Sequence, residues 1–166
     1  MTERAPAKSD KKTAPKPNLG LLDSLVQLSF AVHAALERVA EKHELSLVQV
    51  RLLGILRDRE PLMLELAKFL GLDKSSVTGL VSRAERRGLV QRTASPDDGR
   101  AVHVALTAAG RELMRGAVKQ FERELSTLVG DMSEPDRKRL SELATQIVIG
   151  DSERRVPSAP LLPRSE

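Results

Sequence analysis

Cysteine, tryptophan and tyrosine are absent from the 166 residues, and Phe30, Phe69 and Phe121 are the only phenylalanines. Without cysteine the chain has no disulfide, no thiolate metal ligand and no cysteine-based catalysis or peroxide sensing. Because aromatic side chains are so few, the core has to be built from Leu, Val, Ile and Ala. This composition suits helices that pack on helices.

Long apolar runs are also absent. No run approaches the ~20 residues that a membrane-spanning helix needs, and residues 1–17 lack the apolar stretch of a secretory signal. We therefore expect a soluble, cytoplasmic protein. The motifs GxxxxGK[ST], GxGxxG, HExxH and GxSxG are missing as well, and the only histidines are His33, His43 and His103. The sequence thus predicts no catalytic residues, no cofactor and no enzyme.

The positive charge is concentrated in two segments. Residues 1–19 hold five bases and two acids, a net +3, while the whole chain carries +4. The segment 74–92 also reaches +4, because a single acid, Glu85, accompanies Lys74, Arg83, Arg86, Arg87 and Arg92. Such a concentration is typical of a phosphate-binding surface. A solvated helix face with surplus arginines would give the same pattern.

The ends of the chain differ in composition from its centre. Residues 1–19 are rich in Pro, Lys, Ala and Thr and are predicted to be a disordered basic arm. Residues 151–166 contain three prolines and are predicted to be a tail. Between these ends, Leu21–Lys42 carries apolar residues at spacings of three and four, which predicts a helix. Its apolar stripe is wide, so we expect burial on two sides.

The centre of the chain reads as three shorter helices. One begins at Ser46, with Gln49 as its capping-box partner, and stops before Pro61. The next covers Leu62–Leu70 and is ended by Gly71 in the left-handed conformation. The third begins after Asp73 and ends at Gly88. The carboxylate of Asp73 is expected to cap it by accepting from the backbone N–H of Ser75 or Ser76. Leu72 and Val77 are placed to form a hydrophobic staple at its start.

After Gly88 the apolar period changes from helical to alternating. Leu89–Arg92 and Val102–Leu106 are predicted strands around a turn at residues 95–100, and Thr107 then caps a long helix. A last helix starts with Ser133 and Asp136 and carries Leu140, Leu143, Ile147 and Val148. The order predicts a mainly α fold with a small β-hairpin. A winged helix-turn-helix domain is expected at 46–107, with its motif at Leu62–Leu106. Dimerisation helices are expected on either side of it, at 20–45 and 108–150.

The helix after Asp73 divides into two faces. Its inward positions are apolar: Val77, Leu80, Val81 and Ala84. We expect its outward positions to contact DNA, namely Lys74, Ser75, Ser76, Thr78, Gly79, Ser82 and Arg83. Short hydroxyl side chains let a helix approach the groove floor, and a guanidinium such as that of Arg83 can grip guanine in a bidentate way. Capping is the rival interpretation of the two serines, whereas Thr78, Gly79 and Ser82 lie too far into the helix for it.

The hairpin is predicted to be a second DNA reader. Arg100 stands at its tip, where an arginine can enter a narrow minor groove. Asp98, more than Asp97, is expected to orient an arginine, because an unpaired carboxylate there would repel phosphate. The plain alternative is a solvated turn. For Arg86, Arg87 and Arg92 we expect phosphate contacts or simple solvation.

From about Leu25 to Val148 the chain resembles the MarR family of bacterial regulators. The likeness rests on an ordered set of short segments: Leu66-Ala67, Leu70, Ser76-Val77-Thr78, Leu80-Val81, Glu85, Gly88-Leu89-Val90, Arg92, Asp98-Gly99-Arg100 and Leu106-Thr107-Ala108-Ala109-Gly110. None of these segments is specific alone, but the ordered set covers most of the chain.

The resemblance implies a homodimeric repressor with interlocked first and last two helices, recognition helices in successive major grooves and hairpin arginines in flanking minor grooves. Many members release DNA when a small molecule binds between the dimer helices and the winged domain. The long, doubly apolar terminal helices support a dimer independently. Two-fold symmetry then predicts a near-palindromic operator with half-sites about 10 base pairs apart.

Two further functions stay open from the sequence. One helix face and its end carry residues at a spacing that could hold zinc: His33, Glu37, Glu41 and His43. Zinc binding there would make the protein a metal-responsive regulator. Such residues on a helix surface are usually solvated, and no metal site is predicted. The basic arm could instead serve a non-specific architectural DNA-binding protein. The effector is unknown: the chain offers few aromatics for phenolic ligands and no tryptophan of the kind on which urate-responsive relatives rely.

Overall fold

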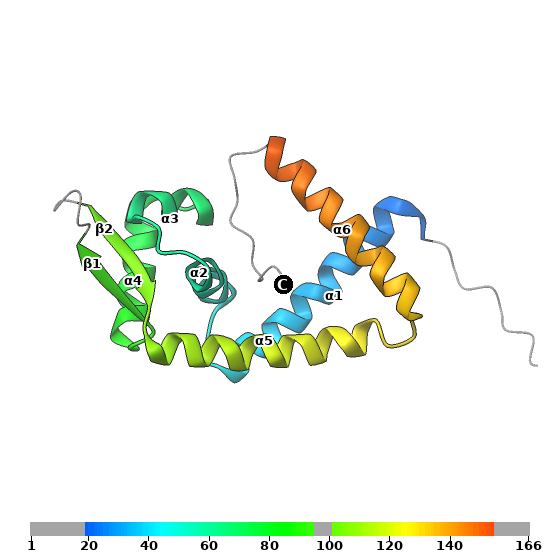
Figure 1. The fold of residues 1–166 in the computed structure, drawn as a ribbon, viewed down its shortest axis with the longest axis horizontal. Helices are drawn as coiled ribbons and strands as arrows, with labels where there is room; N and C mark the ends of the chain where they lie inside the picture. Colours follow the sequence, from blue (N-terminus) through cyan, green and yellow to red (C-terminus); the bar gives the residue numbers. More distant parts are fainter. Residues whose placement is uncertain (1–18, 95–100, 155–166) are drawn as a thin grey trace, which may run out of the picture.

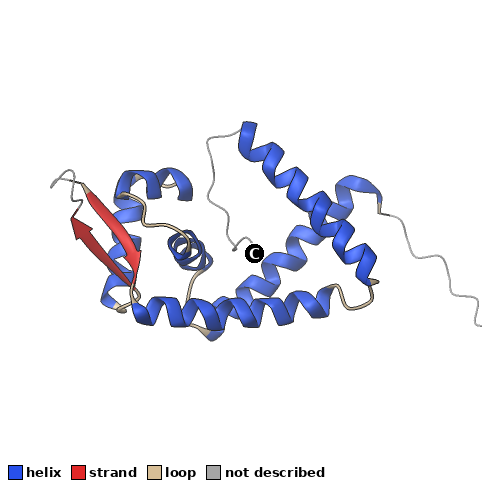
Figure 2. Cartoon of the chain, in the orientation of Figure 1, coloured by secondary structure: helices blue, strands red, loops and turns tan. Residues whose placement is uncertain are grey.

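The computed structural model describes residues 19–94 and 101–154. The elements follow in the order α1 (Gly20–Lys42), α2 (Leu47–Arg57), α3 (Met63–Leu70), α4 (Lys74–Arg86), β1 (Val90–Ala94), β2 (Val102–Leu106), α5 (Ala108–Leu128) and α6 (Glu134–Arg154) (Figure 1). The predicted mainly α fold with one small hairpin is confirmed (Figure 2). The strand β1 begins one residue later than expected and runs two residues further. The helix α6 continues four residues past Gly150, into the segment predicted as tail.

The elements are arranged along the long helix α5. The hairpin, α3 and α4 lie together at one end of the molecule, α5 leads away from the hairpin, and α6 follows at the other end (Figure 1). The strands β1 and β2 pair antiparallel, with Val90 opposite Leu106 and Ala94 opposite Val102. Helices α1 and α2 pack against α5, so the helix-turn-helix is attached to the long terminal helices through both α2 and the hairpin.

The predicted helix caps are present where the polar residues stand. Ser46 and Gln49 form the reciprocal capping box of α2, with bonds of 3.3 and 2.8 Å. Thr107 accepts from the backbone N–H of Gly110 at 3.0 Å and starts α5. Gly71 ends α3 in the left-handed region, at a φ of 66° that glycine adopts without strain. These caps fix the boundaries because each satisfies backbone groups that a helix end leaves unpaired.

Two apolar clusters hold the chain together. The larger one joins α2, α3, α4 and the hairpin around side chains that are almost completely buried: Leu52, Leu53, Leu66, Val77, Val81 and Val104. The smaller one joins α1 to α5 through Ala35, Val39, Ala117 and Phe121. The start of α5 also touches the sheet closely, because a Cβ on Gly110 would lie 2.0 Å from the carbonyl oxygen of Leu89.

The first half of α1 and residues 134–151 of α6 lie outside both clusters. Leu21 and Leu22 are about three-quarters exposed, at 77% and 75%, and no side chain between Glu134 and Asp151 is buried. In the described ranges no helix is both long and apolar enough to cross a membrane. An apolar surface of this extent is typical of a protein–protein interface.

Candidate nucleic-acid interface

The helix α4 presents the polar face that the sequence predicts. Its apolar residues Val77, Leu80, Val81 and Ala84 are buried against the larger cluster. The opposite side exposes Lys74, Ser75, Ser76, Thr78 and Arg83, while Gly79 and Ser82 are partly buried. The larger cluster therefore holds α4 rigidly, with a basic and hydroxyl-rich side turned to solvent.

Both serines at the start of α4 belong to its cap. The Asp73 carboxylate accepts from the backbone N–H of Ser76 at 2.9 Å and from the hydroxyls of Ser75 and Ser76. Because these bonds favour the ionised carboxylate, they hold the pKa of Asp73 well below its usual range. The capping interpretation of the two serines is thus confirmed. Their hydroxyl protons are committed to Asp73, but their oxygens remain available as acceptors.

Thr78 takes no part in the N-terminal cap, as expected, but its hydroxyl has a local partner that the sequence did not suggest. Its hydroxyl donates to the carbonyl oxygen of Lys74 at 2.7 Å, one turn back in α4. Threonine makes this bond readily within helices, since the carbonyl four residues earlier lies in reach. A DNA partner would therefore meet the methyl group and the remaining oxygen lone pairs of an exposed side chain.

Arg92 does not stand free as a phosphate contact or a solvated charge, as the sequence led us to expect. From β1 it reaches back over α4, where Nη2 donates to the Ser82 hydroxyl at 2.9 Å and Nη1 pairs with Glu85. Its Nη2 also lies 3.4 Å from the carbonyl oxygen of Thr78. Ser82 therefore serves an internal bridge between the hairpin and α4, and its predicted DNA contact is restricted by that role.

Arg87 is a second arginine with an internal partner. Its Nη1 and Nη2 donate to the main-chain carbonyls of Glu44 at 2.6 Å and His43 at 3.1 Å, just after α1. The expected phosphate contact is replaced by a tie between the end of α4 and the end of α1. The side chain of Arg86, in contrast, is exposed and forms no hydrogen bond or ion pair with the rest of the described chain.

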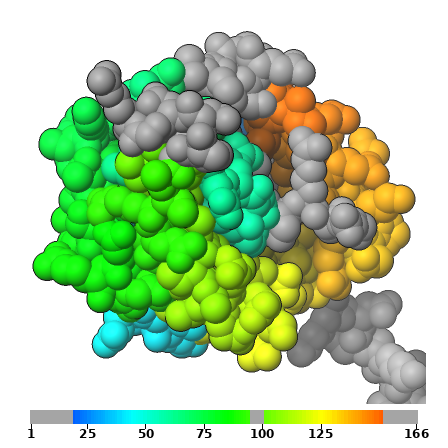
Figure 3. All heavy atoms as spheres, turned by 60° about the vertical axis from the view of Figure 1, so that its left-hand side comes forward, coloured from blue at the N-terminus to red at the C-terminus, as the bar shows by residue number. Residues whose placement is uncertain are grey.

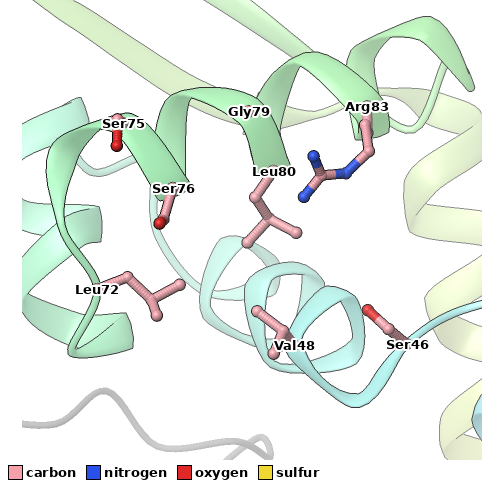
Figure 4. A pocket seen from close by; sticks show the side chains of 8 residues that line it. All are labelled: Ser46, Val48, Leu72, Ser75, Ser76, Gly79, Leu80 and Arg83. Atoms are coloured by element: carbon pink, nitrogen blue, oxygen red, sulfur yellow. The ribbon is translucent and has the colours of Figure 1, made fainter.

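Arg83 stands at the edge of a groove between α4 and the start of α2 (Figure 4). The groove has a volume of about 470 Å³ and is lined by Ser46, Val48, Leu72, Ser75, Ser76, Gly79, Leu80 and Arg83. A Cβ on Gly79 would lie 3.4 Å from Nη1 of Arg83, so the glycine leaves room for the guanidinium. Sequence reasoning missed Ser46 and Val48 of α2 as neighbours of this face, because it looked for DNA contacts only on the recognition helix and the hairpin.

The predicted tip residues Asp97, Asp98 and Arg100 lie outside the described residues. The paired strands lead to them from Ala94 and Val102. The minor-groove contact of Arg100 and the orienting role of Asp98 stay predictions.

The candidate zinc ligands on α1 are not brought together. The His33 ring donates from Nδ1 to the Ser29 carbonyl oxygen at 2.8 Å within its own helix, and Glu37 and Glu41 are exposed. Among the described residues, no group of three His, Asp or Glu side chains has the geometry of a metal site. The metal-responsive alternative therefore gains no support from the geometry.

Known proteins resemble the chain in sequence. The MarR family model matches residues 43–101. The regulator TtmR of Methylorubrum extorquens is 32% identical over 149 residues, which cover 85% of this chain and 75% of TtmR. The repressor NicR of Pseudomonas putida is 30% identical over 130 residues, 76% of this chain and 82% of NicR. The chain belongs to the MarR family. Two Bacillus subtilis regulators, YdgJ and YfiV, match over only 51% and 64% of their length.

The MarR fold extends over most of the chain. The crystal structure of the transcriptional regulator PA4135 superposes with a TM-score of 0.64 at 28% identity, covering 80% of this chain and 96% of that one. The prediction of a MarR-type regulator with a winged helix-turn-helix is therefore confirmed. The same relatives are named regulators or repressors of transcription, in agreement with the expectation that the chain is not an enzyme.

Proposed function

We propose that this MarR-family protein is a sequence-specific, DNA-binding repressor of transcription that acts as a homodimer in the cytoplasm. The observation that carries the proposal is the two-faced helix α4, with four buried apolar residues on one side and an exposed basic and hydroxyl face on the other. A helix of this kind fits the major groove. A repressor of the same family, NicR, is among its relatives.

The DNA contacts divide by type. Arg83 reads a base edge in the major groove, since among the described residues its guanidinium forms no competing bond. The same face also carries Lys74, the hydroxyl oxygens of Ser75 and Ser76, and the methyl group of Thr78. Gly79 allows the DNA to approach closely. Ser82, which is bonded to Arg92, contributes a further contact to the DNA. Arg100 of the wing enters the minor groove, oriented by Asp98.

The dimer is formed by the terminal helices, within residues 20–45 and 108–150. Exposed apolar side chains on α1 and α6 support this assignment, among them Leu21, Leu22, Phe30, Leu143, Ile147 and Val148. Burying them against a second copy removes apolar surface from water. The winged domain at 46–107 then appears twice, so the operator is near-palindromic with half-sites about 10 base pairs apart. The arm at 1–19 adds phosphate contacts.

A small-molecule effector releases the DNA. An apolar cavity of about 130 Å³ between α1, α2 and α5 supports this part of the proposal, because it lies where the terminal helices meet the winged domain. Its lining is entirely apolar: Val32, Leu36, Val39, Val50, Met114, Ala117, Val118 and Phe121.

Selection of bound sequences from random DNA, followed by anisotropy titration of the enriched site, tests the proposal. We expect binding to weaken with added salt, and Arg83→Ala to lower affinity for the selected site about ten- to a hundredfold, as the loss of one bidentate base contact implies. Arg123→Ala, on the exposed side of α5, is the matched control and should bind as the wild type does. Equal affinity for a shuffled site would refute specific binding and favour the architectural alternative.

A further inference from the structure

The recognition helix α4 ends where α1 and α5 both approach it. In Figure 3 the cyan atoms at the end of α1 border the green winged domain. From the other side, the Thr107 hydroxyl at the cap of α5 donates to the carbonyl oxygen of Gly88 at 2.6 Å. The backbone N–H of Thr107 donates to the carbonyl oxygen of Leu89 at 3.1 Å. The bonds made at this point bear on how α4 is oriented relative to the dimerisation helices.

Arg87 provides the directional link to α1. Its Nη1 and Nη2 donate to two different carbonyl oxygens, of Glu44 at 2.6 Å and of His43 at 3.1 Å. Carbonyls at a helix C-terminus lack partners within the helix and carry partial negative charge, which favours a guanidinium there. Ala40 and Leu45 also join the end of α1 to the larger cluster, but such apolar contacts are non-directional. Two bonds from one planar group fix an angle as well as a distance.

The turn that presents these carbonyls has a defined shape. It contains the two backbone bonds of a Schellman motif, at 2.8 and 3.0 Å. Glu44 occupies the left-handed position of the motif with a φ of 54°, which is costly for a residue other than glycine. The His43 ring faces α5, since a Cβ on Gly116 would lie 3.8 Å from its Cε1. A strained turn persists where its surroundings hold it, and Arg87 supplies two of the contacts.

A DNA phosphate is the competing partner for an exposed arginine. Arg87 is exposed, but a phosphate would have to replace two carbonyl bonds that already use both of its terminal nitrogens. Arg86 carries the same charge at the same end of α4, and its side chain has no partner in the described part of the chain. A phosphate near this helix end would therefore pair with Arg86 first. The observations favour an internal role for Arg87.

We propose that Arg87 is a positioning residue that fixes the orientation of α4 relative to α1, and thereby the separation of the two recognition helices in the dimer. The proposal rests on the proposed function, because it assumes that α1 belongs to the dimer interface. In this role Arg87 does not touch DNA. The consequence is that the protein distinguishes operators by the number of base pairs between the half-sites as well as by their sequence.

The separation of the two recognition helices is measured without DNA. The chain has no cysteine, so Lys74→Cys places a single spin label on the exposed start of α4 in each protomer. Double electron–electron resonance then gives the distribution of distances between the two labels in the full-length dimer. We expect Arg87→Met to broaden this distribution about twofold, whereas Arg86→Met should leave it as in the wild type. Equal widths for Arg87→Met and the wild type overturn the proposal, and so does a chain that is monomeric in sedimentation.

Operators with altered spacing test the consequence for DNA. Anisotropy titrations use the selected operator and versions with one base pair added or removed between the half-sites, which turns one half-site by about 35° relative to the other. The wild type should bind the altered operators about tenfold more weakly than the selected one, and Arg87→Met only about threefold more weakly. Partial unfolding lowers the affinity for every operator by the same factor, so a merely structural role leaves these ratios unchanged.

Two further variants separate charge from geometry. Arg87→Lys keeps the positive charge but offers a single nitrogen, so it should relax the spacing preference as Arg87→Met does. Arg86→Met removes a charge from the same end of α4 and should keep the wild-type ratio. A wild-type ratio in Arg87→Lys would overturn the role of the two carbonyl bonds. If Arg87→Met weakens binding to all operators equally and lowers the salt slope by about 1, Arg87 is a phosphate contact and the proposal is wrong.

The two measurements separate this proposal from the proposed function. If no DNA is bound specifically but Arg87→Met broadens the distances, the proposed function fails and the positioning role stands. If the wild type binds its selected operator and the distances do not broaden, the proposed function stands and the positioning role is wrong. Equal wild-type affinity for all three spacings would also overturn the proposal, since the recognition helices would then not be held at one separation.

Discussion

Replacing Arg92 by methionine tests whether the hairpin is held to α4 by an internal bridge. Methionine keeps an apolar stem of similar length but removes the bond to Ser82 and the ion pair with Glu85. A hydrogen bond to a charged group contributes about 1.5–3 kcal/mol, and a partly exposed ion pair contributes up to about 1 kcal/mol. The Arg92 side chain is 28% exposed, so values near the lower limits apply.

We therefore expect Arg92→Met to lower the free energy of unfolding by about 2 kcal/mol. For a chain of this length, about 1 kcal/mol corresponds to 2–4 °C in Tm, which gives a loss of about 4–8 °C. Circular dichroism of the helices is the suitable signal, because the chain has no tryptophan. Protein concentration must be held constant, since a dimer's Tm depends on it.

The double variant of Arg92→Met with Glu85→Gln measures the coupling directly. The two changes should be less than additive, because each removes the same ion pair. Arg86→Met is the control: Arg86 is exposed, forms no bond with the described residues, and should change Tm little. The bridge is refuted if Arg92→Met keeps the wild-type Tm and lowers only the salt dependence of DNA binding, since that result identifies a phosphate contact.

Three other perturbations follow from the same structure. Gly110→Ala should destabilise the protein by about 3 kcal/mol in urea unfolding, because the new Cβ would meet the carbonyl oxygen of Leu89. The control Gly116→Ala should be neutral or stabilising, since the atom nearest to its new Cβ is 3.8 Å away. Equal effects of the two changes would contradict the close contact at Gly110. Because the folded pKa of Asp73 is lowered, its stabilisation is present above about pH 4 and is lost as the pH falls toward the folded value. The Tm gap between the wild type and Asp73→Ala should therefore narrow below pH 4, and a gap independent of pH would contradict the assignment. Ile147→Glu should shift the mass measured by sedimentation toward that of the monomer. The control Leu64→Glu, at an exposed position on α3, should leave the mass unchanged. An unchanged dimer mass for the Ile147 variant would show that α6 is not part of the dimer interface.

Local signals predicted the elements well. Ser46 with Gln49, Asp73 and Thr107 stand at the starts of helices because their side chains satisfy free backbone N–H groups within three residues. The apolar face of α4 was also predictable, since burial follows helical spacing. Such interactions depend on neighbours in the sequence and need no knowledge of the fold.

The partners of the arginines could not be predicted in the same way. Arg87 bonds to carbonyls more than forty residues earlier, and Arg92 reaches ten residues back across a turn. An arginine that binds phosphate and one that binds the protein interior look alike in sequence, because both are long, charged and next to a helix.

The tie between α4 and α1 has a consequence for how the sequence can drift. The acceptors of Arg87 are main-chain carbonyls of His43 and Glu44, which every residue type possesses. Position 43 can therefore change its side chain without losing the tie, and position 44 can do so wherever the new residue tolerates a φ of 54°. Position 87 has less freedom, because the planar guanidinium of arginine directs a separate nitrogen to each of the two carbonyl oxygens, and a lysine ammonium cannot reproduce this geometry. Substitutions are therefore tolerated at positions 43 and 44, after α1, more readily than at position 87, at the end of the recognition helix α4.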